Sequence, residues 1–278
     1  MSSDWHGWEA ALEVARLREV VAAGEPLWTD LRVVGETAST NEDVLKLAAD
    51  GAPEGLVLAA EWQTAGRGRQ GRVWQSGPTG ALTFSVLLRP ATVPPPARGW
   101  VPLLTGVAVA AAVRRVAGLD ARLKWPNDVL AGEKKLAGIL AEQCGDSIVV
   151  GTGLNILGRP GELPAPTATS LQDCGAGPGD RTSLLAEILR QVAGRYRRWQ
   201  AAGGDAGACG LLAEYAALCA TIGKPVRVLL PAGRVLEGTA TGVDGAGQLL
   251  VRLAGQPGGS GRAPGDVAVS AGDVIHVR

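Results

Sequence analysis

Hydrophobic runs along residues 31–222 predict a sheet and several helices. Apolar stretches of strand length, bounded by turn-forming residues, predict these strands: Leu31–Val34, Leu56–Trp62, Ala81–Leu88, Arg122–Trp125, Lys135–Glu142 and Ser147–Ile156. We expect the second and third strands to form a hairpin with a long connection, and the last two to pair through a turn at Gly145-Asp146. Helical patterns predict helices between Ser39 and Gly51 and over Trp100–Val116, Ser183–Trp199 and Gly207–Thr221. Residues 158–180, rich in Gly, Pro and Thr, are expected to form an excursion.

Two helical predictions depend on particular residues. Residues 1–30 predict an N-terminal helical extension whose apolar face holds Leu12, Ala15, Val20 and Val21. Ser39 followed by Glu42 fits a capping box, and Gly51 suits the end of the same helix. Capping by itself therefore explains Ser39.

The pattern changes after Gly223. Short apolar runs between Gly, Pro and Asp turns predict five strands: Val226–Leu230, Val235–Val243, Leu249–Leu253, Val267–Ser270 and Val274–Val277. Their spacing indicates a small β-barrel, and the composition of Gly255–Gly265 indicates a flexible insert. We therefore expect a boundary near Thr221 and three parts, residues 1–30, 31–222 and 223–278.

Composition excludes several function classes. Apolar residues make up 46% of the 278-residue chain, which is enough for a core, and 27 basic side chains balance 27 acidic ones. Zero net charge argues against a general nucleic-acid binder, because such proteins depend on neutralising phosphates. No stretch approaches about 20 uninterrupted apolar residues, and no basic segment precedes an apolar run at the N-terminus. We expect no membrane span, no signal peptide and a cytoplasmic location.

Cysteine and histidine restrict the chemistry further. The four cysteines have no metal-ligand spacing, and Cys144 is expected to be a reduced core thiol. The two histidines, His6 and His276, lie near opposite ends and beside no other chemical motif. A zinc site and a catalytic triad are therefore excluded, and the mechanism is expected to depend on positioning and charge stabilisation.

The arginine loop, Gly66–Arg72, is the most informative segment. Its three glycines allow close approach to a ligand, and its three arginines suit carboxylate and phosphate groups. This mixture favours a loop that closes over an anionic small molecule. A nucleic-acid-binding Arg/Gly tract and a solvated hairpin are the alternatives.

Two further motifs follow in order. Lys124-Trp125-Pro126-Asn127-Asp128 places a lysine where a strand ends, although a solvated lysine and an ordinary turn give the same pattern. Gly151–Ile156 puts glycines and Asn155 inside an apolar strand, which indicates either close approach by a ligand or a satisfied bulge.

The serial order of these segments resembles the biotin protein ligases. Glu61–Arg72 is similar to that family's biotin loop, and Lys124–Asp128 to its Lys-Trp-Pro-Asn-Asp signature. Lys135–Glu142 and Gly153-Leu154-Asn155 resemble its later strands, so the resemblance covers residues 31–278. It implies an α+β fold, with a mixed, largely antiparallel sheet backed by helices as in class II aminoacyl-tRNA synthetases, followed by an SH3-like barrel.

The resemblance also implies a reaction in two steps. Biotin and ATP give biotinyl-5′-AMP and pyrophosphate, and an acceptor lysine then takes the biotin. As catalytic residues it implies Lys124, Arg67 and Arg69. As biotin-binding residues it implies Ser39, Thr40, Asn41, Gln63, Arg67, Gly68, Arg69 and Lys124. As nucleotide-binding residues it implies Arg69, Trp74, Lys124, Asn127 and Asn155.

Cofactors and partners follow from the same resemblance. Mg²⁺ is expected with ATP; its ligands are not identified, and Asp128 is the nearest acidic candidate. The implied acceptor is the biotin carboxyl carrier protein or domain of acetyl-CoA carboxylase or of another biotin-dependent carboxylase. Fewer than 35 residues precede the catalytic pattern, so we expect no operator-binding domain and no repressor activity. The alternatives are a lipoate–protein ligase and a nucleic-acid-binding module.

Overall fold

A seven-stranded sheet forms the centre of the molecule. The computed structural model describes residues 5–22, 26–159, 161–163, 165–230, 233–253, 265–270 and 272–277. The strand order is β1-β2-β5-β9-β8-β7-β6. The strands are β1 (Asp30–Thr37), β2 (Leu56–Gln63), β5 (Ala81–Leu88), β6 (Ala121–Lys124), β7 (Asp128–Ala131), β8 (Lys134–Cys144) and β9 (Ser147–Asn155). Only β1 and β2 pair in parallel, so the predicted mixed, largely antiparallel sheet is confirmed.

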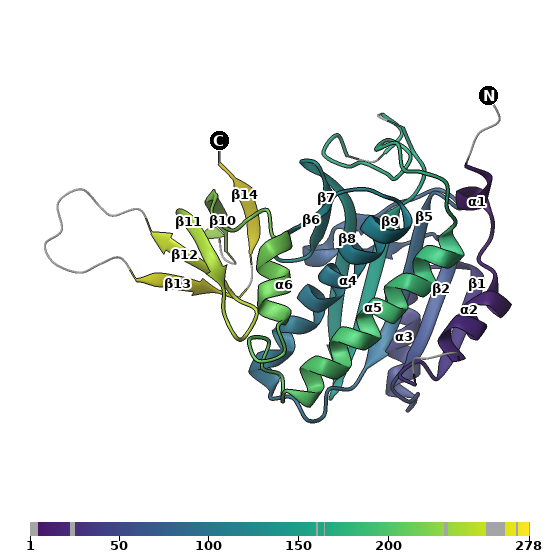
Figure 1. Ribbon diagram of the computed structural model, residues 1–278, viewed down its shortest axis with the longest axis horizontal. Helices are drawn as coiled ribbons and strands as arrows, with labels where there is room; N and C mark the ends of the chain where they lie inside the picture. Colours follow the sequence, from purple (N-terminus) through teal and green to yellow (C-terminus); the bar gives the residue numbers. More distant parts are fainter. Residues whose placement is uncertain are drawn as a thin grey trace, which may run out of the picture.

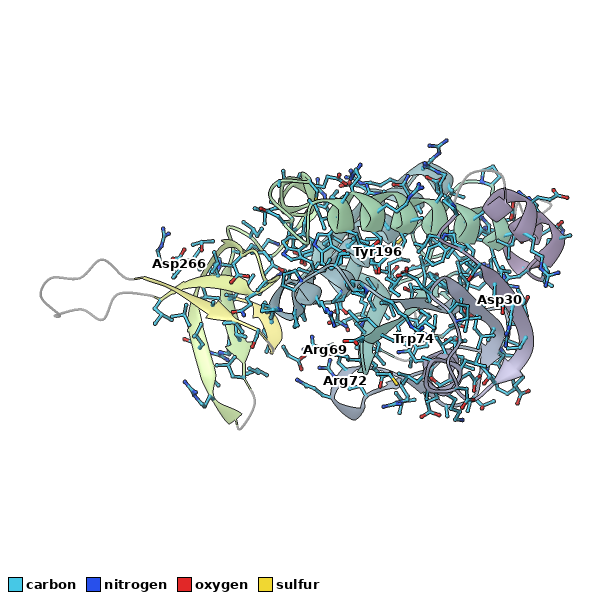
Figure 2. All side chains as sticks on the ribbon, turned by 90° about the horizontal axis from the view of Figure 1, so that it is seen from below. Asp30, Arg69, Arg72, Trp74, Tyr196 and Asp266 are labelled. Atoms are coloured by element: carbon cyan, nitrogen blue, oxygen red, sulfur yellow. The ribbon has the colours of Figure 1, made fainter. Side chains whose placement is uncertain are left out.

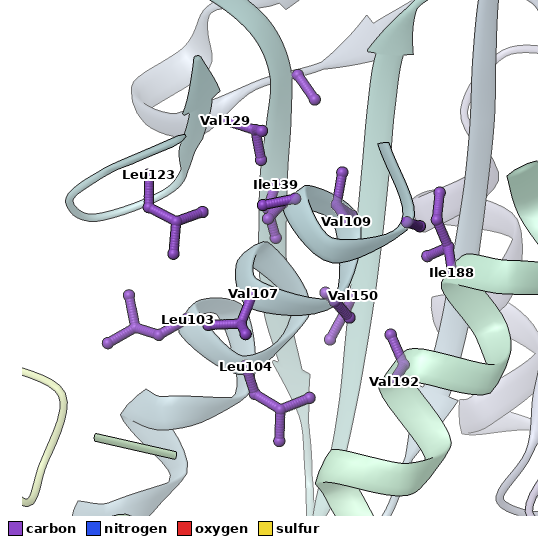
Figure 3. Packing of buried hydrophobic residues seen from close by; sticks show 14 of the residues in the cluster. Leu103, Leu104, Val107, Val109, Leu123, Val129, Ile139, Val150, Ile188 and Val192 are labelled. Carbon is purple, nitrogen blue, oxygen red and sulfur yellow. The ribbon is translucent and has the colours of Figure 1, made fainter. Parts of the chain in front are cut away.

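Helices cover both faces of this sheet (Figure 1). One face carries α4 (Trp100–Val116), α5 (Arg181–Ala201) and α6 (Leu211–Leu218), and the other carries α3 (Thr40–Ala49). The core lies between the sheet and the α4–α5 layer. Figure 3 shows side chains of α4, α5 and the sheet in this layer: Leu103, Leu104, Val107, Val109, Ile139, Val150, Ile188 and Val192.

Helix α4 is apolar on most of its circumference because it is almost fully enclosed. With the preceding short helix η2 (Pro95–Gly99) it forms a 22-residue segment, Pro95–Val116, that is long and apolar enough to cross a membrane by length and composition. An 18-residue stretch of that segment is 67% buried within the protein, as expected for a core helix.

The N-terminal prediction of one helix is wrong. Two short helices, α1 (His6–Glu9) and α2 (Val14–Ala22), are joined by an extended stretch. Leu12 is buried in that stretch, whereas Ala15 is exposed and Leu17 takes its expected place in the core. The side chains of Val20 and Val21 lie outside the described residues.

Hydrogen bonds from the catalytic domain explain this break. The Leu12 backbone N–H donates to Glu61 Oε1 at 2.7 Å, and the buried Arg181 guanidinium donates to Ala10 O at 2.6 Å. Arg181 also pairs with Glu61 at 2.6 Å. The Leu12 N–H and the Ala10 carbonyl are therefore hydrogen-bonded to side chains of the catalytic domain, whereas in a continuous helix they would bond to neighbouring backbone groups.

Ser39 is the N-cap residue of α3, but its side chain makes no capping hydrogen bond. The cap comes from the sheet instead, because the Thr40 N–H donates to Gln63 Oε1 at 2.8 Å. The predicted capping box is therefore wrong in its side-chain contacts, although the start of the helix is correct. Gly51, with φ +90°, follows the C-cap and ends the helix as predicted.

Two other predictions need correction. Strand β7 was not predicted, since Asn127 and Asp128 were interpreted as turn formers, yet Asp128–Ala131 pairs with both β6 and β8. Turn-forming Asn127 and Asp128 concealed a strand of four residues. Cys144 is half-buried at the end of β8 rather than in the core, and Cys219 is the buried cysteine.

A second antiparallel sheet forms the C-terminal domain, in the order β13-β12-β11-β10-β14. Its strands are β10 (Pro225–Leu229), β11 (Val235–Val243), β12 (Leu249–Leu253), β13 (Asp266–Val269) and β14 (Asp273–His276). The predicted flexible insert lies, apart from Gly265, outside the described residues. Trp100 Nε1 donates to Asp244 O at 3.1 Å and Trp125 Nε1 donates to Gly247 O at 3.0 Å. These buried indoles fix the C-terminal domain against the catalytic one.

Candidate active site

A cavity of about 610 Å³ opens where the large sheet, the arginine loop and the C-terminal domain meet. This volume is suited to a small organic ligand. All the predicted site residues contribute to its wall. They are Ser39, Thr40, Asn41, Gln63, Arg67, Gly68, Arg69, Trp74, Lys124, Asn127 and Asn155.

The arginine loop is built on a small hairpin. Strands β3 (Gly66–Arg67) and β4 (Val73–Trp74) pair with each other, and the turn η1 (Arg69–Gly71) joins them. Gln70 and Gly71 have φ values of +57° and +73°, which reverses the chain within a few residues. A Cβ at Gly66 would lie 2.6 Å from Trp74 O, so only glycine allows this pairing distance.

Trp74 lies across two facing glycines of the sheet. Gly138 of β8 is the register partner of Gly153 of β9. A Cβ at Gly153 would come within 2.4 Å of the Trp74 ring, and one at Gly138 within 3.4 Å. A close approach was predicted for the glycines of Gly151–Ile156, and at Gly153 it is made by a tryptophan of the protein itself. The buried Trp74 Nε1 has no hydrogen-bond partner among the described residues.

A buried polar niche lies at the start of α3. Gln63 Oε1 accepts hydrogen bonds from Thr40 N and from Thr40 Oγ1, at 2.8 and 2.9 Å. These contacts fix the amide so that its Nε2 lies beside Gly66, where a Cβ would be 2.9 Å away. Ser39 is buried as well, and its hydroxyl is not used for capping. The niche therefore presents a hydroxyl and an amide donor beside the arginine loop.

Asn41 lines the cavity but is committed to the protein. Its Nδ2 donates to Leu140 O at 3.2 Å and Glu142 Oε2 at 2.9 Å, and its Oδ1 accepts from Ser85 at 2.6 Å. Gly151 makes room for it, because a Cβ there would lie 2.2 Å from Asn41 Oδ1. Both amide hydrogens of Asn41 are therefore used within the protein, and its role in biotin binding stays a prediction.

Arg67 is also less available than predicted. Its guanidinium pairs with Glu42 at 3.3 Å and with Glu142 at 3.2 Å, and the side chain is half-exposed at the rim. Two carboxylates compensate its charge. Arg67 therefore fixes the base of the loop to α3 and β8, and it lines the cavity together with Gly68.

Arg69 extends into the cavity and is held by Asn127. Arg69 Nη1 donates to Asn127 Oδ1 at 3.1 Å, and Asn127 Nδ2 donates to Ile139 O at 3.0 Å. Burial lowers the pKa of Arg69, an effect that the nearby Asp273 carboxylate opposes. Asn127 thus positions an arginine rather than facing the cavity freely. Asn155 Nδ2 donates to Thr169 O at 2.9 Å, which anchors the excursion to β9.

Two lysines complete the positive lining. Lys124, at the end of β6, has no carboxylate within ion-pair distance among the described residues, so its charge is available to a ligand. Lys135 Nζ pairs with Asp128 at 2.6 Å and lies against Gly138. The strand that contains Lys135 was among the predicted motifs, but this lysine had no predicted role. A charged residue at the start of an otherwise apolar strand was the available signal.

The donor set suits Mg²⁺ only as a companion of a phosphate ligand. Within the described part of the chain, no group of three or more His, Cys, Asp or Glu side chains is arranged to hold a metal. Asp128 lines the cavity, but its carboxylate already pairs with Lys135. Mg²⁺ commonly binds through one or two carboxylates together with substrate phosphates, and this site can supply that number.

Comparisons with known proteins agree with this geometry. Residues 34–156 match the "Biotin/lipoate A/B protein ligase family", and residues 221–277 match the "Biotin protein ligase C terminal domain". The biotin--[acetyl-CoA-carboxylase] ligase of Mycobacterium tuberculosis is 41% identical over 271 residues, covering 96% of both chains. The chain belongs to the biotin protein ligase family.

Other members of the biotin protein ligase family extend the comparison. The bifunctional ligase/repressor BirA of Bacillus subtilis is 35% identical over 77% of this chain and 66% of its own length. The structure of the Aquifex aeolicus biotin protein ligase in complex with biotin and ATP superposes with a TM-score of 0.74. It is 27% identical and covers 90% of this chain and 100% of its own. The predicted family and fold are therefore confirmed, including the SH3-like C-terminal domain.

Proposed function

We propose that the protein is an ATP-dependent biotin--protein ligase. It joins biotin to ATP as biotinyl-5′-AMP and transfers the biotin to a lysine of a carboxylase's biotin carrier domain, with acetyl-CoA carboxylase as the expected enzyme. The observation that supports this proposal most strongly is a single cavity lined by a polar niche, the Trp74 ring and several cationic side chains. A cytoplasmic location is part of the same proposal.

The cations suit the first step. A carboxylate oxygen of biotin attacks the α-phosphorus of ATP, and the bond from that phosphorus to the pyrophosphate oxygen breaks. Two anions must approach each other, and Lys124, Lys135 and Arg69 reduce their repulsion and stabilise charge on the phosphate. Among the described residues Lys124 and Arg69 form no ion pair with a carboxylate, whereas Lys135 pairs with Asp128. Mg²⁺ bound with ATP would add charge neutralisation, with Asp128 as the carboxylate in reach.

The niche suits the biotin ring. Gln63 Nε2 can donate to the ureido carbonyl, and the Ser39 hydroxyl can pair with either ureido group. The Thr40 hydroxyl donates its hydrogen to Gln63, so it can only accept from a ureido N–H. The Trp74 ring covers the apolar part of the ligand. Lipoate has no ureido group and would leave these buried groups unpaired. The free-energy cost of these unpaired groups favours biotin over lipoate as the substrate, although the wider family contains ligases for both acids.

The second step releases AMP. The amine nitrogen of the acceptor lysine attacks the acyl carbon, the bond from this carbon to the phosphate oxygen breaks, and the amine loses a proton. None of the described lining residues is histidine, so the mixed anhydride itself supplies the activation. The arginine loop, through Arg67, Gly68 and Arg69, would shield this anhydride from water.

Transfer to a carrier domain tests the proposal. The purified chain is incubated with MgATP, a carrier domain, and either biotin or lipoate, and the carrier is analysed by mass spectrometry. We expect a single biotin amide at the carrier lysine and no product on a carrier with that lysine replaced by arginine. Lipoylation in place of biotinylation, or no adduct with either acid, would contradict the proposal.

A further inference from the structure

The C-terminal domain forms part of the cavity wall. Leu229 of β10 and Asp273, Val274 and Ile275 of β14 line the cavity. Figure 2 shows Arg69 and Arg72 of the arginine loop between the two domains. The loop thus meets the catalytic sheet at its base and the C-terminal domain at its tip.

Two polar contacts join the loop tip to the start of β14. The Arg72 guanidinium forms an ion pair with the Asp273 carboxylate. Arg69 Nη2 donates to Gly272 O at 3.4 Å, while its other terminal nitrogen holds Asn127. The adjacent residues Gly272 and Asp273 therefore bind Arg69 and Arg72 of the arginine loop.

The loop has little apolar packing to hold its tip closed. Val73, between Arg72 and Trp74, is 66% exposed, the highest exposure among the large hydrophobic side chains that the structure describes. Residues 69–73 form only the short turn η1 and the start of β4. The position of the tip consequently depends on its polar contacts.

We propose that Asp273 is a positioning residue whose carboxylate, carried by the C-terminal domain, pairs with Arg72 and holds the arginine loop closed over the adenylate. The inference deepens the proposed ligase function and rests on it for the identity of the enclosed intermediate. It gives the C-terminal domain a defined part in the reaction, since this domain restrains the lid that retains biotinyl-AMP. Arg72 is 58% and Asp273 33% exposed, so the restraint is modest and reversible, as a lid requires.

Asp273→Asn tests the ion pair while keeping the size of the side chain. The matched control is Asp266→Asn, which removes a carboxylate of the same domain that pairs with Arg252 at 2.9 Å. Asp266 lies away from the arginine loop in Figure 2. Trypsin cleavage after Arg67 and Arg69 measures loop opening. We expect Asp273→Asn to be cleaved about two- to fivefold faster than wild type, the range of an exposed ion pair, and Asp266→Asn at the wild-type rate.

Exchanging the charges of Arg72 and Asp273 shows whether their ion pair itself holds the loop, or whether Asp273 only supports the structure of its domain. In the double variant Arg72→Asp with Asp273→Arg, protection at Arg67 and Arg69 should return toward wild type, while either single variant remains more sensitive. Leakage of biotinyl-AMP into solution should follow the same order, and the rate of adenylate formation should change less than the leakage.

The positioning role of Asp273 is supported if the variants are cleaved as expected above. It is overturned if Asp273→Asn is cleaved as fast as wild type or more slowly, or if the exchanged pair does not recover its protection. The proteolysis assay is run first on the ligand-free protein, so it does not depend on the substrate. Absence of biotin-dependent pyrophosphate release from the wild-type protein would instead overturn the proposed ligase function.

Discussion

Glycines of β8 and β9 shape the cavity, because they leave room for side chains from other segments. Gly138 and Gly153 face each other across β8 and β9 and leave a flat surface on which the Trp74 ring lies. Gly151, one pleat away, admits Asn41. The glycine pattern in the sequence indicated a close approach but could not say by which group, because the approaching residues come from distant segments.

Gly153→Ala tests this arrangement. The added Cβ would meet the ring at 2.4 Å, so Trp74 must shift away from the sheet. We expect the KM for biotin to rise about 10- to 100-fold, since displacement of a positioning group by about 1 Å has effects of that size. Gly35→Ala on β1 is the matched control, because no atom lies within 4 Å of the position that its added Cβ would take. Equal KM values for the two variants would contradict the assigned role of Trp74.

Lys124 is the cavity lysine that forms no ion pair with any carboxylate of the described residues. Lys124→Met should lower biotin-dependent pyrophosphate release about 10²- to 10³-fold, the usual effect of removing one donor that stabilises transition-state charge. Lys46→Met removes a lysine from the exposed surface of α3 and should leave the rate unchanged. Stopped-flow measurement of the first turnover separates this step from transfer. A Lys124→Met rate within a few fold of wild type would show that another group carries the charge.

At the scale of elements, local patterns determined much of the fold. Buried runs such as Ala81–Leu88 and Trp100–Val116 appear in the structure with the predicted limits, because burial on both sides leaves an unbroken apolar signal. The failures occurred where tertiary contacts override local preference. Glu61 and Arg181 interrupt the N-terminal helix, and sheet pairing makes Asp128–Ala131 a strand.

The arginine loop is the element on which retention of the intermediate depends. Arg69→Gly removes the hydrogen bonds to Asn127 and Gly272 and adds flexibility to the turn. We expect biotinyl-AMP to escape faster and to biotinylate lysines of a bystander protein mixed with the carrier. Streptavidin blotting of both proteins measures selectivity. Unchanged selectivity would count against a protective function of the loop.

At the scale of the whole molecule, the site is shared between two domains. Arg72 and Asp273 are separated by 201 positions in the sequence, so no local pattern connects them. His276 was expected to stand apart from other motifs, but its Nε2 lies 3.1 Å from Thr221 Oγ1, which accepts from Trp125 N at 3.2 Å. The sequence predicted which catalytic-domain segments converge, but it did not predict this contribution of the C-terminal domain.

The domain junction should weaken in mild acid. Burial, followed by the charges of Lys124 and Lys224, lowers the pKa of His276 below its ordinary value of 6.5, and Glu133 partly opposes the shift. The unfolded chain therefore takes up this proton at a higher pH than the folded protein. The stabilisation is complete above about pH 6.5 and is lost as the pH falls through the folded-state pKa.

Urea unfolding between about pH 8 and about pH 5.5 measures the effect. His276→Gln, which cannot be protonated, should show a smaller loss of unfolding free energy over this range than wild type. A wild-type loss equal to that of the variant would contradict the role assigned to His276.

Biotin-dependent pyrophosphate release shows most directly whether this cavity activates biotin with ATP. The purified protein is given MgATP with biotin, with lipoate or with neither, and pyrophosphate is measured in the first turnover. The structure predicts release with biotin alone, at a yield close to one per active site. Release with lipoate instead, or release that is independent of either acid, would contradict the proposed biotin ligase function.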